Sequence, residues 1–195
     1  MLFLNKGAQD GGSMKKNIGS VLGLYPTPTV VIGALVDGKV NWVLVAHVGI
    51  IGHDRIMVSL AKAHYTNKGI KENKVLTVNI VDESILKKAD YVGCVTGSRV
   101  DKSEVFSYIM GESGAPVIEE SPLVMECSVV DVYETDTFES FILKIDQTYA
   151  EEKVLDENGK INYKELKPVL FEMPTYSYLK TGDVIAKCMK LGNED

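Results

Sequence analysis

Two largely apolar runs face each other across a single Asp-Gly pair early in the chain. The runs are Val30–Val36 and Lys39–Val45, and only Asp37 and Gly38 separate them. A two-residue loop of this kind joins antiparallel strands, because both loop positions need a positive φ that Asp and Gly tolerate. The sequence therefore predicts a β-hairpin over residues 30–45.

Further β-type runs follow along the chain. They are Ile56–Leu60, Leu76–Ile80, Leu123–Tyr133, Phe138–Asp146 and Val169–Glu172. In the second of these runs apolar and polar residues alternate, which is the period-2 pattern of a strand with two different faces. The third and fourth runs form a long antiparallel pair joined near residues 134–137, and Phe141, Leu143 and Ile145 share one face of the fourth.

Three short segments between the strands have helical spacing. We expect helices over Thr66–Asn73, with Thr66 as the N-cap, over Ser84–Val92 and over Lys102–Met110. Residues 151–168 are charged and contain Asn158-Gly159, which indicates an exposed excursion. This order of elements predicts a mainly β (α+β) fold, a closed antiparallel barrel with short peripheral helices.

Composition narrows the class of protein. The chain has 195 residues, 45% of them hydrophobic, and a formal net charge of −6. These values are typical of a globular chain, and we expect one domain over residues 14–195. The acidic balance argues against a nucleic-acid partner. No apolar run approaches the ~20 residues of a membrane-spanning helix, so no membrane partner is expected. We interpret residues 1–13 as a linker, a tag remnant or a disordered N-terminus.

Cysteine and histidine spacing argues against a metal site. Cys94, Cys127 and Cys188 lie far apart and form no CxxC motif, so neither a zinc site nor a redox dithiol is indicated. The histidines show no HExxH spacing, and we expect no protein-held metal. Reduced thiols fit a cytoplasmic protein. Cys127 is in phase with apolar neighbours and should behave as a buried hydrophobe, whereas Cys94 lies nearest the candidate site described next.

The sequence contains no nucleophile, Walker or GxGxxG motif, but polar residues gather at the end of the run Ile56–Leu60 and just after it. Ser59 is followed by Lys62, His64, Tyr65 and Thr66, which lead into a predicted helix. A helix N-terminus with a hydroxyl and nearby cations suits a phosphate monoester, although a capped helix with surface charges would read the same. The turn 97–102, with two cations before a predicted helix, is a second candidate or simply an exposed turn.

The order of several short motifs resembles the flavin reductase-like family, which includes the flavoredoxins. The resemblance covers about Ile18 to Lys187. The motifs are Tyr25-Pro-Thr-Pro28, Ser59-Leu60, Tyr65-Thr66, Val78-Asn79, Tyr91-Val-Gly93, Gly97, Asp101-Lys102, Ala115-Pro116 and Cys127. The family fold that this resemblance implies is the FMN-binding split β-barrel of Greek-key type.

The resemblance also implies a homodimer that binds one FMN per subunit in a groove near the dimer interface. Apolar residues on both faces of the run 123–133 also favour a second copy as partner. Carried over by position, three groups of residues would hold the cofactor. Beside the ring and ribityl chain lies the stretch Asn41–His47, which includes Trp42, Val45, Ala46 and His47. Lining the pocket are Ser59, Leu60, Ala61 and Lys62, and at the phosphate are His64, Tyr65, Thr66 and Lys102.

Three pocket assignments leave a packing alternative open. Asn79 could be a polar residue at a strand edge, Tyr178 an aromatic packed on the barrel, and Trp42 a filler of the hairpin. No catalytic side chain is expected, because in a flavoprotein the isoalloxazine itself carries the redox chemistry at N5.

The function that the resemblance implies is oxidoreduction through bound FMN. NAD(P)H would be the electron donor, and free flavin, a ferric complex or a redox protein the acceptor. A flavoredoxin-type electron carrier without its own nicotinamide site is the first alternative. A split-barrel protein for another ligand, such as haem or a pyridoxal phosphate compound, is the second.

Overall fold

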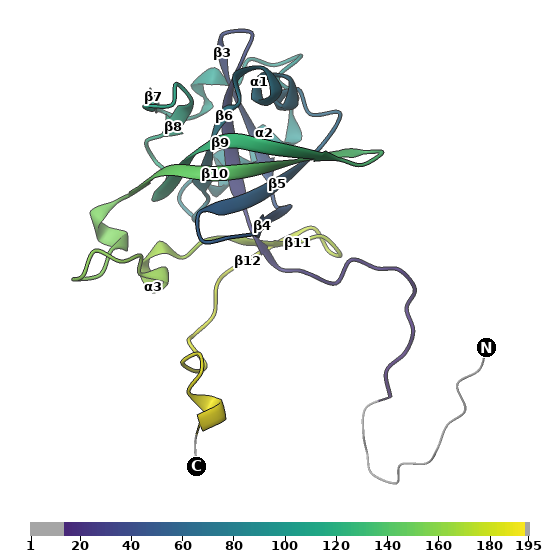
Figure 1. Cartoon of the computed structure of the whole chain (residues 1–195), viewed down its shortest axis with the longest axis vertical. Coiled ribbons are helices and arrows are strands. Elements are labelled where there is room, and N and C mark those ends of the chain that lie inside the picture. The colour runs from purple at the N-terminus through teal and green to yellow at the C-terminus, as the bar shows by residue number, and fades with distance from the viewer. Residues whose placement is uncertain (1–13, 194–195) are drawn as a thin grey trace.

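The computed structural model describes residues 14–193 (Figure 1), so the interpretation of residues 1–13 falls outside the described residues. The strands are β1 (Thr27–Pro28), β2 (Val30–Val36), β3 (Lys39–Val45), β4 (Val48–Ile50), β5 (Arg55–Ala61), β6 (Val75–Ile80), β7 (Tyr108–Met110), β8 (Pro116–Ile118), β9 (Leu123–Glu134), β10 (Phe138–Ala150), β11 (Leu170–Glu172) and β12 (Ser177–Leu179). The α-helices are α1 (Thr66–Asn73), α2 (Leu86–Cys94) and α3 (Tyr163–Leu166). The 3-10 turns are η1 (Ser103–Val105), η2 (Glu152–Val154) and η3 (Leu191–Asn193).

The predicted hairpin is confirmed. Strands β2 and β3 pair antiparallel from Val30↔Val45 to Val36↔Lys39. Asp37 and Gly38 have φ values of 52° and 75°, so both loop residues take the left-handed conformation that this tight connection requires. The five predicted strands are also confirmed, as β5, β6, β9, β10 and β11.

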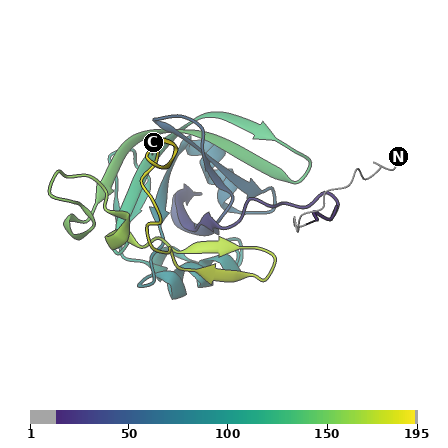
Figure 2. The same ribbon diagram turned by 90° about the horizontal axis from the view of Figure 1, so that it is seen from below.

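A seven-stranded sheet forms the barrel, in the order β3-β2-β6-β9-β10-β5-β4. Strand β3 lies at one edge, yet it contacts β5 near the other edge, because the sheet curls around its own core. Figure 2 shows this curl from below. The predicted mainly β fold is confirmed, but the expected closure is not, because within residues 14–193 the edge strands β3 and β4 do not pair with each other.

The core has two parts, one on each side of β2 and β3. Ile32, Phe141 and Leu143 lie inside the barrel, where Ile145 packs against them. Val31 and Trp42 face outward into a second apolar layer beneath α2, η1 and β8. Strands that are buried on both faces read as continuous apolar runs, which explains the composition of Val30–Val36.

Two of the three predicted helices are present, as α1 and α2, but their N-termini differ from the prediction. Helix α1 has the predicted bounds, but Thr66 is its first residue and not its N-cap; the N-cap position is Tyr65, which makes no side-chain cap bond. The Thr66 hydroxyl instead accepts a hydrogen bond from Asn41. Helix α2 begins two residues later than Ser84, because Asp82 accepts the backbone N–H groups of Ser84 and Ile85 ahead of it.

The helix expected over Lys102–Met110 is wrong. The segment forms η1 and then β7, which pairs with β8. Phe106 is fully buried against Trp42, whereas Ile109 is 55% exposed. The apolar residues of this segment therefore do not share one face, and their helical spacing was coincidental.

The exposed excursion expected over 151–168 is wrong in part. Val154 and Leu166 are buried and pack with Leu123 at the start of β9, which fixes η2 and α3 against the barrel. The residues of the Asn158-Gly159 turn are exposed as predicted. Within residues 14–193, no helix is long and apolar enough to cross a membrane. In the same range, no three His, Cys, Asp or Glu side chains come together as metal ligands would.

Candidate functional site

Two adjoining cavities form a groove on one side of the barrel. The wider one has a volume of about 460 Å³ and the narrower one about 270 Å³. They share His64, Gly93 and Cys94, so the β5–α1 loop and the end of α2 form the walls at their junction. We call the two parts the wide end and the narrow end of the groove.

The wide end is mostly apolar and aromatic. Phe138 comes from β10, whereas Phe171 and Tyr178 come from the β11–β12 hairpin. The His47 ring lies 5.5 Å from that of Phe138, and its Nε2 is 2.9 Å from the Tyr25 hydroxyl. These walls suit a flat, largely apolar ring that displaces water.

Tyr178 and Asp90 close one wall of the wide end. The Tyr178 hydroxyl donates to Asp90 Oδ1 at 2.7 Å, which links β12 to α2. Burial raises the pKa of Tyr178, and the hydrogen bond to the Asp90 carboxylate raises it further. Tyr178 therefore stays a neutral phenol, and the link between the two elements persists at physiological pH.

The narrow end presents two side-chain donors, each with a proton that has no hydrogen-bond partner among residues 14–193. Asn41 Nδ2 donates to Thr66 Oγ1 at 2.7 Å, so the hydroxyl proton of Thr66 is available to another acceptor. Lys102 Nζ donates to the carbonyls of Val92 and Val95, each at 3.1 Å. An ammonium has three N–H groups, so one remains for a ligand. A hydroxyl and a cation that converge in this way suit a phosphate group.

Burial controls the charge at the narrow end. It lowers the pKa of Lys102 from its ordinary 10.5 to about 8, so the ammonium is still protonated at neutral pH. Burial also lowers the pKa of His64, and the nearby Lys102 charge lowers it further. At neutral pH the narrow end therefore carries one buried cation beside a neutral imidazole.

Two glycines allow the end of α2 and the next turn to approach β3. A Cβ on Gly93 would lie 3.0 Å from Leu44 Cβ, and one on Gly97 would overlap Asn41 Oδ1. Larger residues at these positions would push the wall outward. The groove therefore depends on backbone close approach at both positions.

Most of the predicted site residues line this groove. At the wide end lie Val45, Ala46, His47, Ser59, Ala61 and Tyr178, with His64 at the junction; at the narrow end lie Tyr65, Thr66 and Lys102. The proposed phosphate loop and the Lys102 turn, which lie far apart in sequence, meet at the narrow end. Both interpretations of Tyr178 fit its position, since it lines the cavity and also packs against Phe171.

The structure places four predicted residues outside the groove. Trp42 is fully buried against Phe106 and Tyr108, so it fills the outer core, which was its packing alternative. Leu60 is buried inside the barrel. Asn79 is buried and bonds the backbone of Val31 and Ile118, and Lys62 pairs with Glu134 on the outer surface. Alternation along β5 directs Leu60 to the opposite face from Ser59 and Ala61, which line the cavity.

Sequence reasoning missed several residues of the wide end. They are Thr29, Asp90, Phe138, Phe171, Met173 and Tyr176. Asp90 carried a weak signal, because it lies one helical turn before Cys94 and so shares its face of α2. The others belong to strands and turns that only the curling of the sheet brings together.

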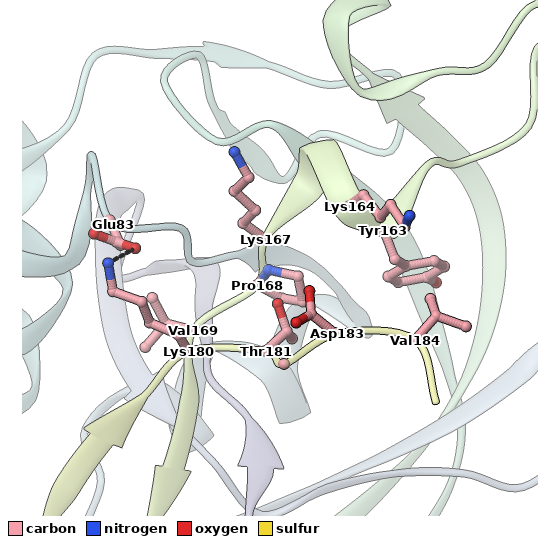
Figure 3. Close-up of a pocket in the computed structure, with 11 residues that line it drawn as sticks. Glu83, Tyr163, Lys164, Lys167, Pro168, Val169, Lys180, Thr181, Asp183 and Val184 are labelled. Atoms are coloured by element: carbon pink, nitrogen blue, oxygen red, sulfur yellow. Dashed lines mark ion pairs between the residues drawn. The ribbon is translucent and has the colours of Figure 1, made fainter. Parts of the chain in front are cut away.

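A separate cavity of about 500 Å³ lies beside the segment that follows β12. Figure 3 shows that its lysines do not converge, because Lys164 and Lys167 point in different directions and Lys180 turns toward Glu83. The Lys180–Glu83 ion pair measures 2.7 Å. This cavity therefore offers no focused charge for a ligand, unlike the groove.

Comparison with known proteins agrees with the fold and the groove. The model of the flavin reductase like domain matches residues 22–176. The structure of flavoredoxin from Methanosarcina acetivorans is 36% identical and covers 93% of this chain and 98% of its own, with a TM-score of 0.88. That of flavoredoxin from Desulfovibrio vulgaris (Miyazaki F) is 31% identical over 92% of this chain and 100% of its own, with a TM-score of 0.84.

Two more distant proteins share part of the sequence or the fold of this chain. An FMN-binding protein from Thermus thermophilus, 18% identical, has the same fold with a TM-score of 0.76 and covers 92% of this chain and 100% of its own. An uncharacterized protein of Aeropyrum pernix is 28% identical over 133 residues, which is 65% of this chain. The chain spans about half the length of this curated relative. Because the family model matches most of the chain, this protein belongs to the flavin reductase-like family, with the split-barrel fold that its sequence resembles.

Proposed function

We propose that this protein binds FMN in the groove and acts as a flavin-dependent oxidoreductase. The observation that carries the proposal is the pairing of an apolar wide end with the two unused donors of the narrow end, on Thr66 and Lys102. FMN has the matching form, a flat ring at one end and a phosphate at the other.

When bound, the flavin supplies hydride and electron transfer. The residues of the chain bind and orient the cofactor. Phe138 and Phe171 exclude water at the wide end, and Thr66 and Lys102 hold the phosphate. This division of labour needs no catalytic acid or base from the protein, and we assign none. We take NAD(P)H as the electron donor and free flavin, a ferric complex or a redox protein as the acceptor.

A flavoredoxin-type electron carrier is the second candidate. It is favoured by the two flavoredoxin structures described above, which are 36% and 31% identical to this chain. Such a carrier would bind FMN in the same groove but would receive its electrons from another protein, without a nicotinamide site.

Anaerobic stopped-flow spectroscopy of the FMN-loaded protein separates the two candidates. We expect NADH or NADPH to bleach the flavin absorbance in a saturable reaction. Flavin that binds but is bleached by neither nicotinamide would support the carrier. A protein that binds no flavin, but takes up haem or a pyridoxal phosphate compound, would contradict both.

We also propose that the protein is a homodimer. The segments before β1 and after β12 extend away from the barrel (Figure 1). They carry exposed apolar side chains, among them Met14, Ile18, Val21, Leu22, Leu24, Val184, Ile185 and Leu191. Exposed apolar surface of this kind marks interaction sites, and a second copy would cover it.

An obligate interface should bury on the order of 2,000 Å² and resist dilution. Light scattering at micromolar concentration should therefore give the mass of two chains, and a monomer would contradict the proposal.

We place the protein in the cytoplasm. Its three cysteines are free thiols, which suits a reducing compartment.

A further inference from the structure

Asp90 places an exposed carboxylate in the wall of the wide end. It is the only carboxylate among the described residues that line this cavity, and these include no lysine or arginine. Its Oδ1 accepts the Tyr178 hydroxyl at 2.7 Å, and its Oδ2 lies 4.0 Å from Cys94 Sγ. Because Tyr178 and Cys94 also line the cavity, the carboxylate is held between two residues of the same wall. An exposed carboxylate of this kind carries a negative charge at neutral pH.

No cation forms an ion pair with Asp90 within residues 14–193. Lys87 and Lys88 share helix α2 with it, but Lys88 pairs with Glu120 at 2.7 Å and Lys87 forms no ion pair with Asp90. Lys102 donates to two backbone carbonyls at the narrow end instead. The charge of Asp90 therefore acts on the contents of the wide end without a bound counter-charge.

Reduction changes the charge of a flavin ring. At neutral pH the ring takes up two electrons and one proton, supplied by NAD(P)H or by a redox protein and water, so the reduced ring carries one negative charge more than the oxidised ring. A fixed carboxylate beside the ring repels this added charge and has little effect on the neutral oxidised ring. A flavin in the wide end would therefore be bound more weakly when it is reduced.

We propose that Asp90 lowers the reduction potential of the bound flavin by repelling the charge that the ring gains on reduction. This inference rests on the proposed function, because it requires flavin in the groove with its ring at the wide end. Lys102 attracts the phosphate at the narrow end, whereas Asp90 acts against the reduced ring at the wide end. A flavin of lower potential is a stronger electron donor to its acceptor.

The test is Asp90→Asn, which removes the charge and keeps an oxygen that can accept the Tyr178 hydroxyl. The ratio of the dissociation constants of reduced and oxidised FMN should fall about three- to tenfold, the range for one unit charge at a partly exposed site. The midpoint potential of bound FMN should therefore rise by about 15–30 mV, at about 30 mV per factor of ten for a two-electron couple. Riboflavin should shift by the same amount, since it carries the same ring.

The potential is measured on the flavin-loaded full chain by anaerobic reduction with dithionite in the presence of a reference dye. Tyr178→Phe removes the link to α2 but keeps the charge, so it should change the affinities for oxidised and reduced flavin by the same factor and leave the potential unchanged. Asp131→Asn removes an exposed carboxylate on β9, outside the groove, and should also leave the potential unchanged. High salt should reduce the difference between the wild type and Asp90→Asn, because it screens an exposed charge.

Three outcomes would overturn the inference. If Asp90→Asn leaves the potential unchanged or lowers it, the carboxylate does not act on the ring as inferred, and the proposed function is unaffected. If Tyr178→Phe raises the potential as much as Asp90→Asn does, the position of the wall and not the charge is responsible. If the wild type binds neither FMN nor riboflavin, the proposed function falls as well.

Discussion

Replacement of Lys102 by Met would test the phosphate anchor most directly. Lys102 is 3% exposed, and two of its N–H groups bond the carbonyls of Val92 and Val95. The third is available to the FMN phosphate, and a hydrogen bond from a charged group is worth about 1.5–3 kcal/mol. Lys102→Met should therefore weaken FMN about ten- to a hundredfold, because ~1.4 kcal/mol is a factor of ten.

Riboflavin provides the internal control, because it has the ring and the ribityl chain but no phosphate. Its affinity for Lys102→Met should match that for the wild type when both ligands are titrated by fluorescence quenching at pH 7. Equal losses for FMN and riboflavin would show that Lys102 only shapes the groove by holding the end of α2. No loss for either ligand would remove Lys102 from the site.

The pH dependence of FMN binding adds a second measurement. Burial lowers the pKa of Lys102 to about 8, so the unliganded wild type loses this proton above pH 8. Binding of the phosphate then requires proton uptake, and FMN affinity should fall by up to about tenfold per pH unit above pH 8. Lys102→Met should lack this slope, and so should riboflavin with either protein. A slope that persists in the variant would refute the assignment.

The same lowered pKa also makes the stability of the unliganded protein depend on pH. Between pH 8 and 10.5 the unfolded chain holds the Lys102 proton and the folded chain does not, so stability should rise with pH across this window. The full rise is roughly 3 kcal/mol, from 1.36 kcal/mol per pKa unit. Lys102→Met should lack this rise in urea unfolding, and a rise of the same size in both proteins would refute the reasoning.

Three further predictions follow from individual contacts. Asn41→Ala should weaken FMN binding severalfold in a titration, because Thr66 loses its orienting donor. Asn73→Ala, which loosens the other end of α1, should lower stability in urea unfolding by about 1–3 kcal/mol and leave FMN affinity unchanged. Burial raises the pKa of Glu126, but hydrogen bonds from Ser113, Tyr149 and Glu112 lower it more. The contribution of Glu126 to stability should therefore be complete above about pH 4.5 and lost as pH falls through the lowered pKa. Glu126→Gln should flatten acid unfolding followed by circular dichroism. Burial raises the pKa of Cys127 to about 12, so a thiol reagent at pH 8 should label Cys94 in the folded protein but Cys127 only after unfolding, and labelling of Cys127 in the native state would contradict its burial.

Local sequence was sufficient for the parts of the fold that short-range geometry controls. The hairpin at Asp37-Gly38 and helix α1 have the predicted bounds, because backbone preferences and alternation within a few residues decide them. The same reasoning failed over Lys102–Met110, because this segment forms no α-helix and Phe106 packs on Trp42 instead. In that segment, the gain from burial in the outer core outweighed the local pattern.

The candidate site followed the same division. Thr66 and Lys102 could be proposed from sequence because each lies in a recognisable polar segment. Their shared cavity, the unused protons on both and the contact of Asp90 with Tyr178 depend on strands and a helix end that are distant along the chain. Only the curling of the sheet decides which side chains face the groove and which are left without partners, because that depends on contacts between residues that no local pattern links.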